Sequence, residues 1–313
     1  MRLAAVPGNV SMNEFYDKLD ELYQSGNLKA IEEFLLDAIK QTGENSPERA
    51  GLLNELGGFY RGLSRYPESV DSFMQSLDIF ESIEMSATPE YATVLLNLAG
   101  LYRIVGDGDK AIDLFFNAMK KLKDAGAGDS YAYVSILNNL ALAYQTKGEL
   151  KHALEYATQA LEIIRAGAGG DHEIASSLNN LAAIRFLLGE FDIADTLISE
   201  ALAMYDAMEE PNVHHAAALA TKAAVMCSWG NYDDSLIGFR QALELIRQFF
   251  GENIEFATCK RNISEVCELL GDMPSAVLEL TESLRIMEKL LGPNHPSVKA
   301  SQTKLEKLLT PNS

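Results

Sequence analysis

A repeat of 41 or 42 residues constrains this sequence more than any other feature. In each copy a glycine, or in one copy a serine, follows a stretch of helically spaced apolar residues, and two small residues follow five and twelve positions later. These turn residues are Ser64, Gly106, Gly148, Gly189, Gly230 and Gly271. Their successive spacings are 42, 42, 41, 41 and 41 residues. A chain of 313 residues with this period is predicted to be one array rather than two globular domains.

Each copy predicts a pair of amphipathic helices. Apolar and small residues recur at i, i+3, i+4 and i+7 on both sides of the turn, which is the spacing of a helix with one buried face. Glycine ends the first helix because it adopts the left-handed backbone of a helix C-cap without strain. Ser46 and Thr88 are predicted N-caps, and each precedes a proline. Because no copy shows the alternation of a strand, we predict an all-α fold.

The two ends of the array differ from its central copies. A degenerate first pair has its turn at Gly26, only 38 residues before the next turn. Residues 296–309 match a single first helix, which we expect to cap the array with Leu305 and Leu309 facing inward.

These elements define the expected domain organisation. Residues 1–11 are predicted to be an unstructured leader, since their apolar run is shorter than that of a secretory signal. Residues 12–309 are predicted to form one solenoid of about seven helix pairs and the cap, and residues 310–313 a short tail.

The recurring residues resemble the tetratricopeptide repeat (TPR) family. One copy shows the family pattern in Leu140, Ala141, Tyr144, Gly148, Ala153 and Ala160. The repeat is seven or eight residues longer than the usual 34, as in kinesin light chains and related bacterial proteins, whose linker resembles residues 290–296. The resemblance implies a right-handed superhelical α-solenoid of helix-turn-helix repeats. It also implies a non-enzymatic scaffold whose first helices line a concave groove.

The charge balance limits the classes of partner. Lys and Arg number 26 and Asp and Glu 45, so the formal net charge is −19. This balance argues against nucleic acid and against anionic membranes, because both are bound through clustered basic residues. We therefore expect a neutral or basic protein or peptide as the partner. Cys227, Cys259 and Cys267 are too few and too odd in number for an oxidised secreted protein, which predicts a cytoplasmic location.

Catalytic and cofactor motifs give no support for an enzyme. Phosphate-binding, zinc-protease, nucleophile-elbow and paired-cysteine patterns are absent. Residues 106–111 match a dinucleotide-loop pattern, but they follow a predicted helix instead of the strand which that loop requires. The five histidines are scattered, and the adjacent pair His214 and His215 points in two directions on a helix. We predict no catalytic residue, no metal and no cofactor.

Asparagine recurs nine residues before the turn. This position holds Asn97, Asn139, Asn180 and Asn262, whereas Glu55 and Thr221 interrupt the row. The family resemblance implies that the position faces the groove. Each asparagine costs several tenths of a kcal/mol of helix propensity against alanine. Its carboxamide carries both donors and an acceptor, so it can bind a peptide main chain of any sequence.

We predict a peptide-binding groove along the first helices. The predicted groove residues are Asn97, Asn138, Asn139, Asn179, Asn180, Asn262, Arg103, Gln145, Phe186 and Arg261. Equivalent helices lie about 10 Å apart, which an extended ligand spans in about three residues. The alternative is a structural row in which the asparagines bind one another, water or the adjacent helix.

Two other functions stay open at this point. The chain can be a regulatory receptor for a small signalling peptide, as some bacterial relatives are. It can also self-assemble, because Phe115-Phe116 and Phe249-Phe250 are candidate surface pairs. Trp229, directly before the turn at Gly230, is expected to pack between repeats.

Overall fold

The computed structural model describes residues 12–208 and 213–310. The predicted leader, residues 1–11, and the last three residues of the predicted tail lie outside this range. The described residues form fifteen α-helices and one π-helical segment, and no strand occurs among them. The chain divides into two compact parts, residues 1–136 and 137–313, and each is described by itself.

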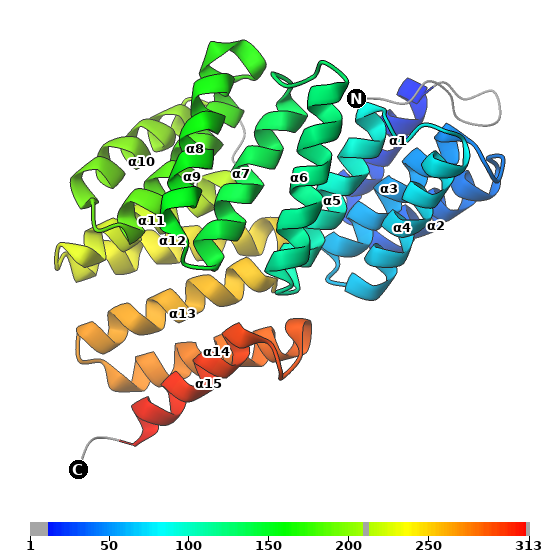
Figure 1. The fold of residues 1–313 in the computed structure, drawn as a ribbon. Coiled ribbons are helices and arrows are strands. Elements are labelled where there is room, and N and C mark those ends of the chain that lie inside the picture. Colours follow the sequence, from blue (N-terminus) through cyan, green and yellow to red (C-terminus); the bar gives the residue numbers. More distant parts are fainter. Residues whose placement is uncertain (1–11, 209–212, 311–313) are drawn as a thin grey trace. The chain divides into compact units, whose positions relative to one another are not determined.

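The first part consists of helix pairs joined by short turns (Figure 1). Its helices are α1 (Met12–Ser25), α2 (Leu28–Lys40), α3 (Pro47–Gly62), α4 (Tyr66–Ser82), α5 (Pro89–Ile104) and α6 (Gly108–Asp124), followed by the start of α7 (Tyr131–Thr146). Within each pair the two helices pack against each other, and α4 also packs against α5.

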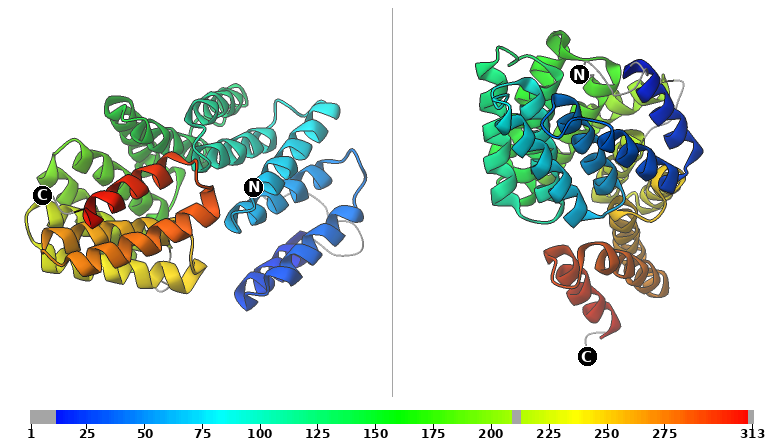
Figure 2. Two further views of the ribbon diagram at one scale, coloured as in Figure 1. Left: turned by 90° about the horizontal axis from the view of Figure 1, so that it is seen from below. Right: turned by 90° about the vertical axis from the view of Figure 1, so that its right-hand side faces the viewer.

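The second part repeats the same unit. After the end of α7 come α8 (Leu150–Ile163), the π-helical segment η1 (Ile164–Ala168), α9 (Asp171–Leu187), α10 (Phe191–Asp206), α11 (Val213–Ser228), α12 (Tyr232–Phe250), α13 (Ile254–Leu269), α14 (Met273–Leu291) and α15 (Pro296–Leu309). Figure 2 shows α15, in red, beside α14, against which it packs. The predicted all-α solenoid of helix-turn-helix repeats with a capping helix is confirmed. A single solenoid over residues 12–309 stays a prediction.

The predicted turn residues all have a left-handed backbone. The φ angle is 66° at Gly26 and 59° at Ser64, and it lies between 76° and 90° at the other five turn glycines. The residue after the turn closes the helix end: the Asp107 N–H, for example, donates to the Tyr102 carbonyl at 2.9 Å. A second series of left-handed residues lies in the connections between pairs, at Glu84, Gly126, Gly167, Gly251 and Gly292.

Both predicted N-caps are confirmed. The Ser46 Oγ accepts a hydrogen bond from the Arg49 N–H at 3.1 Å, and the Thr88 Oγ1 accepts one from the Tyr91 N–H at 3.3 Å. Each satisfies one of the backbone donors that a helix start leaves without a partner within the helix.

Small residues allow the two helices of a pair to approach closely. The residues five and twelve positions after the turn are fully buried in every pair from α3–α4 onward. Where this residue is serine, its hydroxyl bridges to the partner helix. The Ser69 and Ser76 hydroxyls donate to the carbonyls of Gly57 and Ala50 at 2.7 and 2.6 Å.

Two further serine bridges of this kind lie in the second part. The Ser235 hydroxyl donates to the Ala223 carbonyl at 2.7 Å, and the Ser283 hydroxyl donates to the Ala257 carbonyl at 2.6 Å. In the pairs α5–α6, α7–α8 and α9–α10 both positions are alanine, so these pairs have no such bridge.

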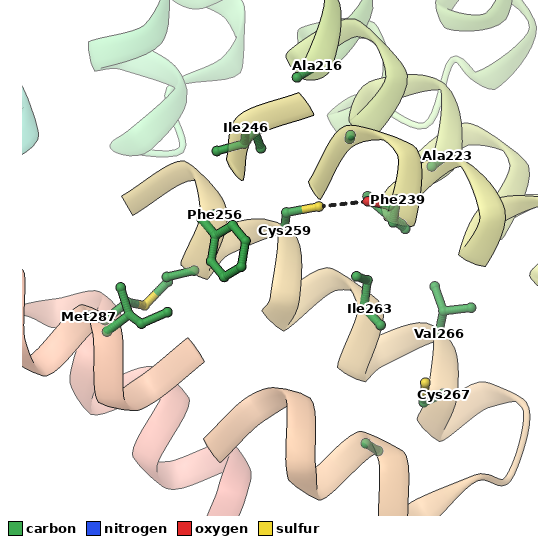
Figure 3. Close-up of a cluster of buried hydrophobic side chains, with 14 of the residues drawn as sticks. Ala216, Ala223, Phe239, Ile246, Phe256, Cys259, Ile263, Val266, Cys267 and Met287 are labelled. Atoms are coloured by element: carbon green, nitrogen blue, oxygen red, sulfur yellow. Dashed lines mark hydrogen bonds between the residues drawn. The ribbon is translucent and has the colours of Figure 1, made fainter. Parts of the chain in front are cut away.

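The cysteines are free, as the sequence predicts. Cys259 and Cys267 are buried in the apolar cluster of α11 to α15 (Figure 3). The Cys259 thiol donates to the Phe239 carbonyl at 3.2 Å, and burial raises its pKa to about 12. A thiol with such a pKa is a packing group and a poor nucleophile.

Three predictions about single side chains were wrong. Phe115 is fully buried, so only Phe116 of that predicted surface pair is exposed. Trp229 is 44% exposed, because it lies beyond the last helical turn of α11, where the neighbouring pairs do not cover it. Leu309 is 59% exposed at the last residue of α15, whose buried residues are Val298 and Ser301.

Candidate functional site

The side chains three, nine and ten residues before each turn lie beside the buried core, and we call them the polar row. They include all the predicted groove residues. The residue after each asparagine nine positions before a turn, such as Leu98, Leu140 or Leu181, is almost fully buried. The row asparagines themselves are half-buried. Because a helix that packs against neighbours on one face leaves its margins partly open, these side chains lie between core and solvent. The other predicted groove residues, Arg103, Gln145, Phe186 and Arg261 included, are also half-buried.

In the first part, the row links α3 to α5. The Asn97 Nδ2 donates to the Asn54 Oδ1 at 2.9 Å, and the Arg61 Nη1 donates to the Asn97 carbonyl at 3.4 Å. Burial raises the pKa of Glu55, which interrupts the asparagine row, and burial lowers the pKa of Arg61. The row of α3 therefore holds two partly dehydrated charged groups of opposite sign.

In the second part, two row residues also bind a neighbouring helix. The Asn138 Nδ2 donates to the Ser177 Oγ at 3.0 Å, and the Thr221 hydroxyl donates to the Asn179 Oδ1 at 2.8 Å. These bonds are of the kind that the structural alternative predicts. In the second part these hydrogen bonds occupy the side chains of Asn138 and Asn179, and they do not involve every residue of the row.

Other polar groups of the row are open to a ligand. Among the described residues, the Asn180 and Asn262 carboxamides make no hydrogen bond with the protein, and the Arg261 guanidinium makes neither a hydrogen bond nor an ion pair. Asn139 does have a polar or ring partner. The Phe186 ring packs on Phe191, with ring centroids 5.5 Å apart.

Two buried acceptors on α7 lack hydrogen-bond partners. The Asn138 Oδ1 and the Gln145 Oε1 are shielded from solvent, and no donor reaches either atom. The two residues are seven positions apart and therefore lie on one face of the helix. A buried acceptor without a partner costs about 1–3 kcal/mol. A ligand that supplies N–H donors along this face would recover that free energy.

Two surface cavities lie elsewhere. One of about 590 Å³ is lined by Glu268 and by residues of α15, and one of about 370 Å³ is lined by residues of α2, α3 and α4. Neither cavity is lined by a predicted groove residue. The groove stays a prediction from the polar row.

A histidine cluster in the second part was not predicted. The ring of His172 lies 4.9 Å from that of His214 and 6.0 Å from that of Tyr205, centroid to centroid. His215 stacks on Tyr205 at 5.6 Å, and its Nε2 lies 3.4 Å from the Asp206 Oδ1. The starts of α9 and α11 bring these rings together, and sequence spacing alone shows no such contact.

His214 is expected to make stability depend on pH. Partial loss of hydration lowers its pKa, the neighbouring His172 lowers it further, and Glu173 opposes both. The unfolded chain then binds a proton near pH 6.5 more readily than the folded chain, so the free energy of unfolding falls as the pH drops below that value.

The measurement is Tm for the native protein and for His214→Asn between about pH 7.5 and 5. We expect the native Tm to fall more steeply than that of the variant, and titration of the other groups cancels in the difference. Two parallel curves would contradict the assignment.

Metal and membrane features are not found in the part of the chain that the structure describes. No group of three or more His, Cys, Asp and Glu side chains is placed to hold a metal ion. None of its helices combines the length and the apolar character needed to cross a bilayer.

Comparisons with known proteins point to one repeat family. The family model of the tetratricopeptide repeat matches residues 48–119 and 132–207. No curated protein matches the chain.

Solved structures share the fold at low sequence identity. NprR in complex with its cognate peptide NprX is 15% identical, with a TM-score of 0.64 over 95% of this chain and 88% of that chain. A Rap protein complexed with competence and sporulation factor is 14% identical, with a TM-score of 0.59 over 95% and 98%. A Podosopora anserina protein assigned as a kinesin light chain, with nearly identical TPR-like repeats, is 20% identical, with a TM-score of 0.50 over 64% and 97%. At these identities the likeness shows the fold alone.

Proposed function

We propose that this chain, a tetratricopeptide-repeat protein, is a non-enzymatic interaction scaffold that binds an extended peptide along the polar row of its first helices. The ligand is a free peptide or a segment of a partner protein. Tetratricopeptide-repeat proteins are in general interaction scaffolds, which supports the scaffold role. Peptide binding to this row is the proposal.

The buried, unpartnered acceptors of α7 carry this proposal. The Asn138 Oδ1 and the Gln145 Oε1 are hydrogen-bond acceptors that no donor reaches, and the main chain of a peptide has N–H groups of the required kind. Asn180 on α9 and Asn262 on α13 add carboxamides that are open to both a donor and an acceptor. Main-chain recognition by such groups does not depend on the ligand's sequence, so specificity would come from the side chains between the contacts.

Charge supports a neutral or basic ligand. The chain carries a net charge of −19, which attracts cationic partners and repels acidic ones. In the polar row of the second part, Arg261 is a cation without an ion pair among the described residues. One such cation is a weak basis for binding an acidic peptide. The free cysteines are consistent with the predicted cytoplasmic location.

The test begins with ligand selection. A displayed library of random peptides about 12 residues long, which span about 40 Å when extended, is selected on the native protein. The affinity of a selected peptide is then measured by calorimetry for the native protein and for Gln145→Met. This variant keeps the shape of the side chain and removes the unpartnered oxygen.

We expect Gln145→Met to lower affinity about five- to tenfold while the unliganded protein keeps its Tm or gains stability. Asn180→Ala/Asn262→Ala should lower affinity by about tenfold or more. The matched controls are Gln302→Met, whose side chain already donates to Glu288 at 2.7 Å, and Asn117→Ala on the exposed face of α6. Gln302→Met should lower stability and leave affinity unchanged.

The opposite pattern would refute the proposal. If Gln145→Met lowers Tm and leaves affinity unchanged, the polar row is structural. N-methylation of the selected peptide gives an independent measure, because removal of main-chain donors must weaken binding if the main chain is what the row recognises.

A receptor for a short signalling peptide is the second candidate. The fold similarity to NprR with its cognate peptide and to a Rap protein with competence and sporulation factor favours it. A single short peptide that co-purifies in stoichiometric amount would favour the receptor, whereas a mixture of partners favours the general scaffold. If the chain instead self-assembles, which is the third hypothesis, the molar mass measured by light scattering rises with protein concentration.

A further inference from the structure

Three consecutive turns in the second part expose an unusual amount of apolar side chain. They join α9 to α10, α11 to α12 and α13 to α14, and they comprise residues 187–193, 228–234 and 269–275. We call these three turns the apolar turn edge. Its exposed large side chains are Leu187 (47%), Ile193 (47%), Trp229 (44%), Leu269 (54%), Leu270 (42%) and Met273 (39%).

The corresponding turns of the three preceding pairs do not share this property. In residues 62–68, 104–110 and 146–152, all of which the structure describes, no large apolar side chain is exposed. The repeat therefore does not require exposed apolar side chains in the turn between the two helices of a pair. Exposed apolar patches cost solubility and mark interaction sites when they are contiguous.

The three turns lie next to one another. Helix α9 packs against α11, and α11 packs against α13, so their C-terminal ends lie on one side of the second part. In Figure 1 the turns from α11 to α12 and from α13 to α14 both lie at the left of the view. The exposed side chains consequently form a line across three helix pairs.

The charges on the apolar turn edge all have one sign. Its residues include five acidic groups, Glu190, Asp192, Asp233, Asp234 and Asp272, and no Lys or Arg. The corresponding turns of the preceding three pairs contain four acidic and four basic residues. Glu190 forms an ion pair with Arg185, just outside these residues, whereas the other four acidic groups have no ion pair among the described residues. The edge therefore combines apolar side chains with a predominantly negative margin.

We propose that the apolar turn edge docks a basic amphipathic helix of another protein. The apolar face of such a helix covers the leucines and Trp229, and its Lys and Arg side chains reach the acidic margin. A second copy of this chain does not fit, because two acidic margins would face each other. An anionic membrane surface is repelled for the same reason.

This surface is distinct from the polar row. It comprises the last residue of each first helix, the turn and the start of the second helix, whereas the row follows the length of the first helices and meets the edge only where Phe186 precedes Leu187. The proposal therefore stands whether or not the row binds a peptide, and a protein that uses both surfaces can hold two partners at once.

The chain supplies its own probe of this surface. Trp229 is the single tryptophan of the sequence, so tryptophan fluorescence reports the edge and nothing else. The test titrates the full chain with a synthetic amphipathic helix of Leu and Lys, and in parallel with the same peptide in which every Lys is Glu. We expect the Lys peptide to shift Trp229 emission to shorter wavelength with saturation, and the Glu peptide to leave it unchanged.

Matched variants locate the binding surface. Leu269→Ser/Leu270→Ser should weaken the Lys peptide by about tenfold or more, whereas Leu278→Ser, on the outer face of α14 and 68% exposed, should leave affinity unchanged. Asp233→Asn/Asp234→Asn should weaken binding and reduce its dependence on salt. The charge control Asp113→Asn/Glu155→Gln makes the same change in net charge at exposed residues away from the edge.

Several outcomes would overturn the proposal. Binding without a shift in Trp229 emission would place the peptide elsewhere on the acidic surface. Equal losses of affinity in the edge variants and in their controls would show that the Lys peptide binds through unspecific electrostatic attraction. A blue shift that develops with protein concentration alone, together with a dimer in light scattering that Leu269→Ser/Leu270→Ser abolishes, would assign the edge to a second copy of the chain.

Discussion

Phe115→Ala is expected to lower the free energy of unfolding by about 3–5 kcal/mol. The Phe115 ring is fully buried on α6, where Ala111 and Ala118, both also fully buried, leave room for a large side chain. Its removal takes apolar area out of the core and leaves a cavity that rigid helices cannot fill. Urea denaturation followed by circular dichroism measures the loss.

The adjacent residue provides the control. Phe116 is 38% exposed, so Phe116→Ala should change the free energy of unfolding by less than about 1 kcal/mol. A large loss in both variants, or in Phe116→Ala alone, would contradict the packing of α6. The contrast also bears on self-assembly, because only one ring of this pair is available to a partner.

Gly57→Ala is expected to cost about 1–3 kcal/mol, although alanine is the better helix former. A Cβ added at Gly57 would lie 2.7 Å from both Cδ1 and Cε1 of Phe73, which is fully buried on α4. No real Cβ makes contacts this short, so the ring or the helix must move. The free energy of unfolding measures the cost.

Gly58→Ala is the matched control on the same helix. No atom lies within 4 Å of a Cβ built at Gly58, so this variant should gain about 0.5–1 kcal/mol from helix propensity. Gly57→Ala/Phe73→Leu should be more stable than the sum of its two single changes predicts, because the smaller side chain relieves the clash. If both glycine variants have the same sign, the close approach of α3 and α4 is wrong.

The repeat made the backbone predictable. Each turn depends on one residue that tolerates a left-handed conformation, and Gly106 or Gly148 can be recognised in the sequence without knowledge of its neighbours. Even Ser64, which is not glycine, was placed correctly, because the period required a turn there. The same locality explains the N-caps at Ser46 and Thr88, each of which depends on a residue three positions away.

Side-chain environments were less predictable because they depend on the neighbouring pair. Phe115 and Phe116 are identical residues on one helix, and only the packing of α6 decides which is buried. Trp229 has an apolar side chain at a turn, and nothing in its own repeat shows that no neighbour covers it. The sequence pattern favours packing of Trp229 between repeats, and the exposure of its side chain follows only from the three-dimensional packing.

The polar row shows the same limit within the candidate site. Its asparagines could be found by their recurrence, but their partners could not. Asn54 and Asn138 both lie ten residues before their turns, yet Asn54 accepts a hydrogen bond from Asn97 whereas Asn138 donates one to Ser177, so equivalent positions have different partners. The unpartnered oxygens of Asn138 and Gln145 follow from three-dimensional packing and have no signal in the sequence.

The serine bridges divide the helix pairs into two mechanical classes. In α3–α4, α11–α12 and α13–α14, a hydroxyl held at hydrogen-bond distance from the partner backbone fixes the axial offset of the two helices. In α5–α6, α7–α8 and α9–α10, alanine methyl groups meet the partner helix, and such a contact can slide by a fraction of an ångström without breaking a bond. The alanine pairs are therefore the ones able to shear, and an adjustment to a bound partner would be taken up there first.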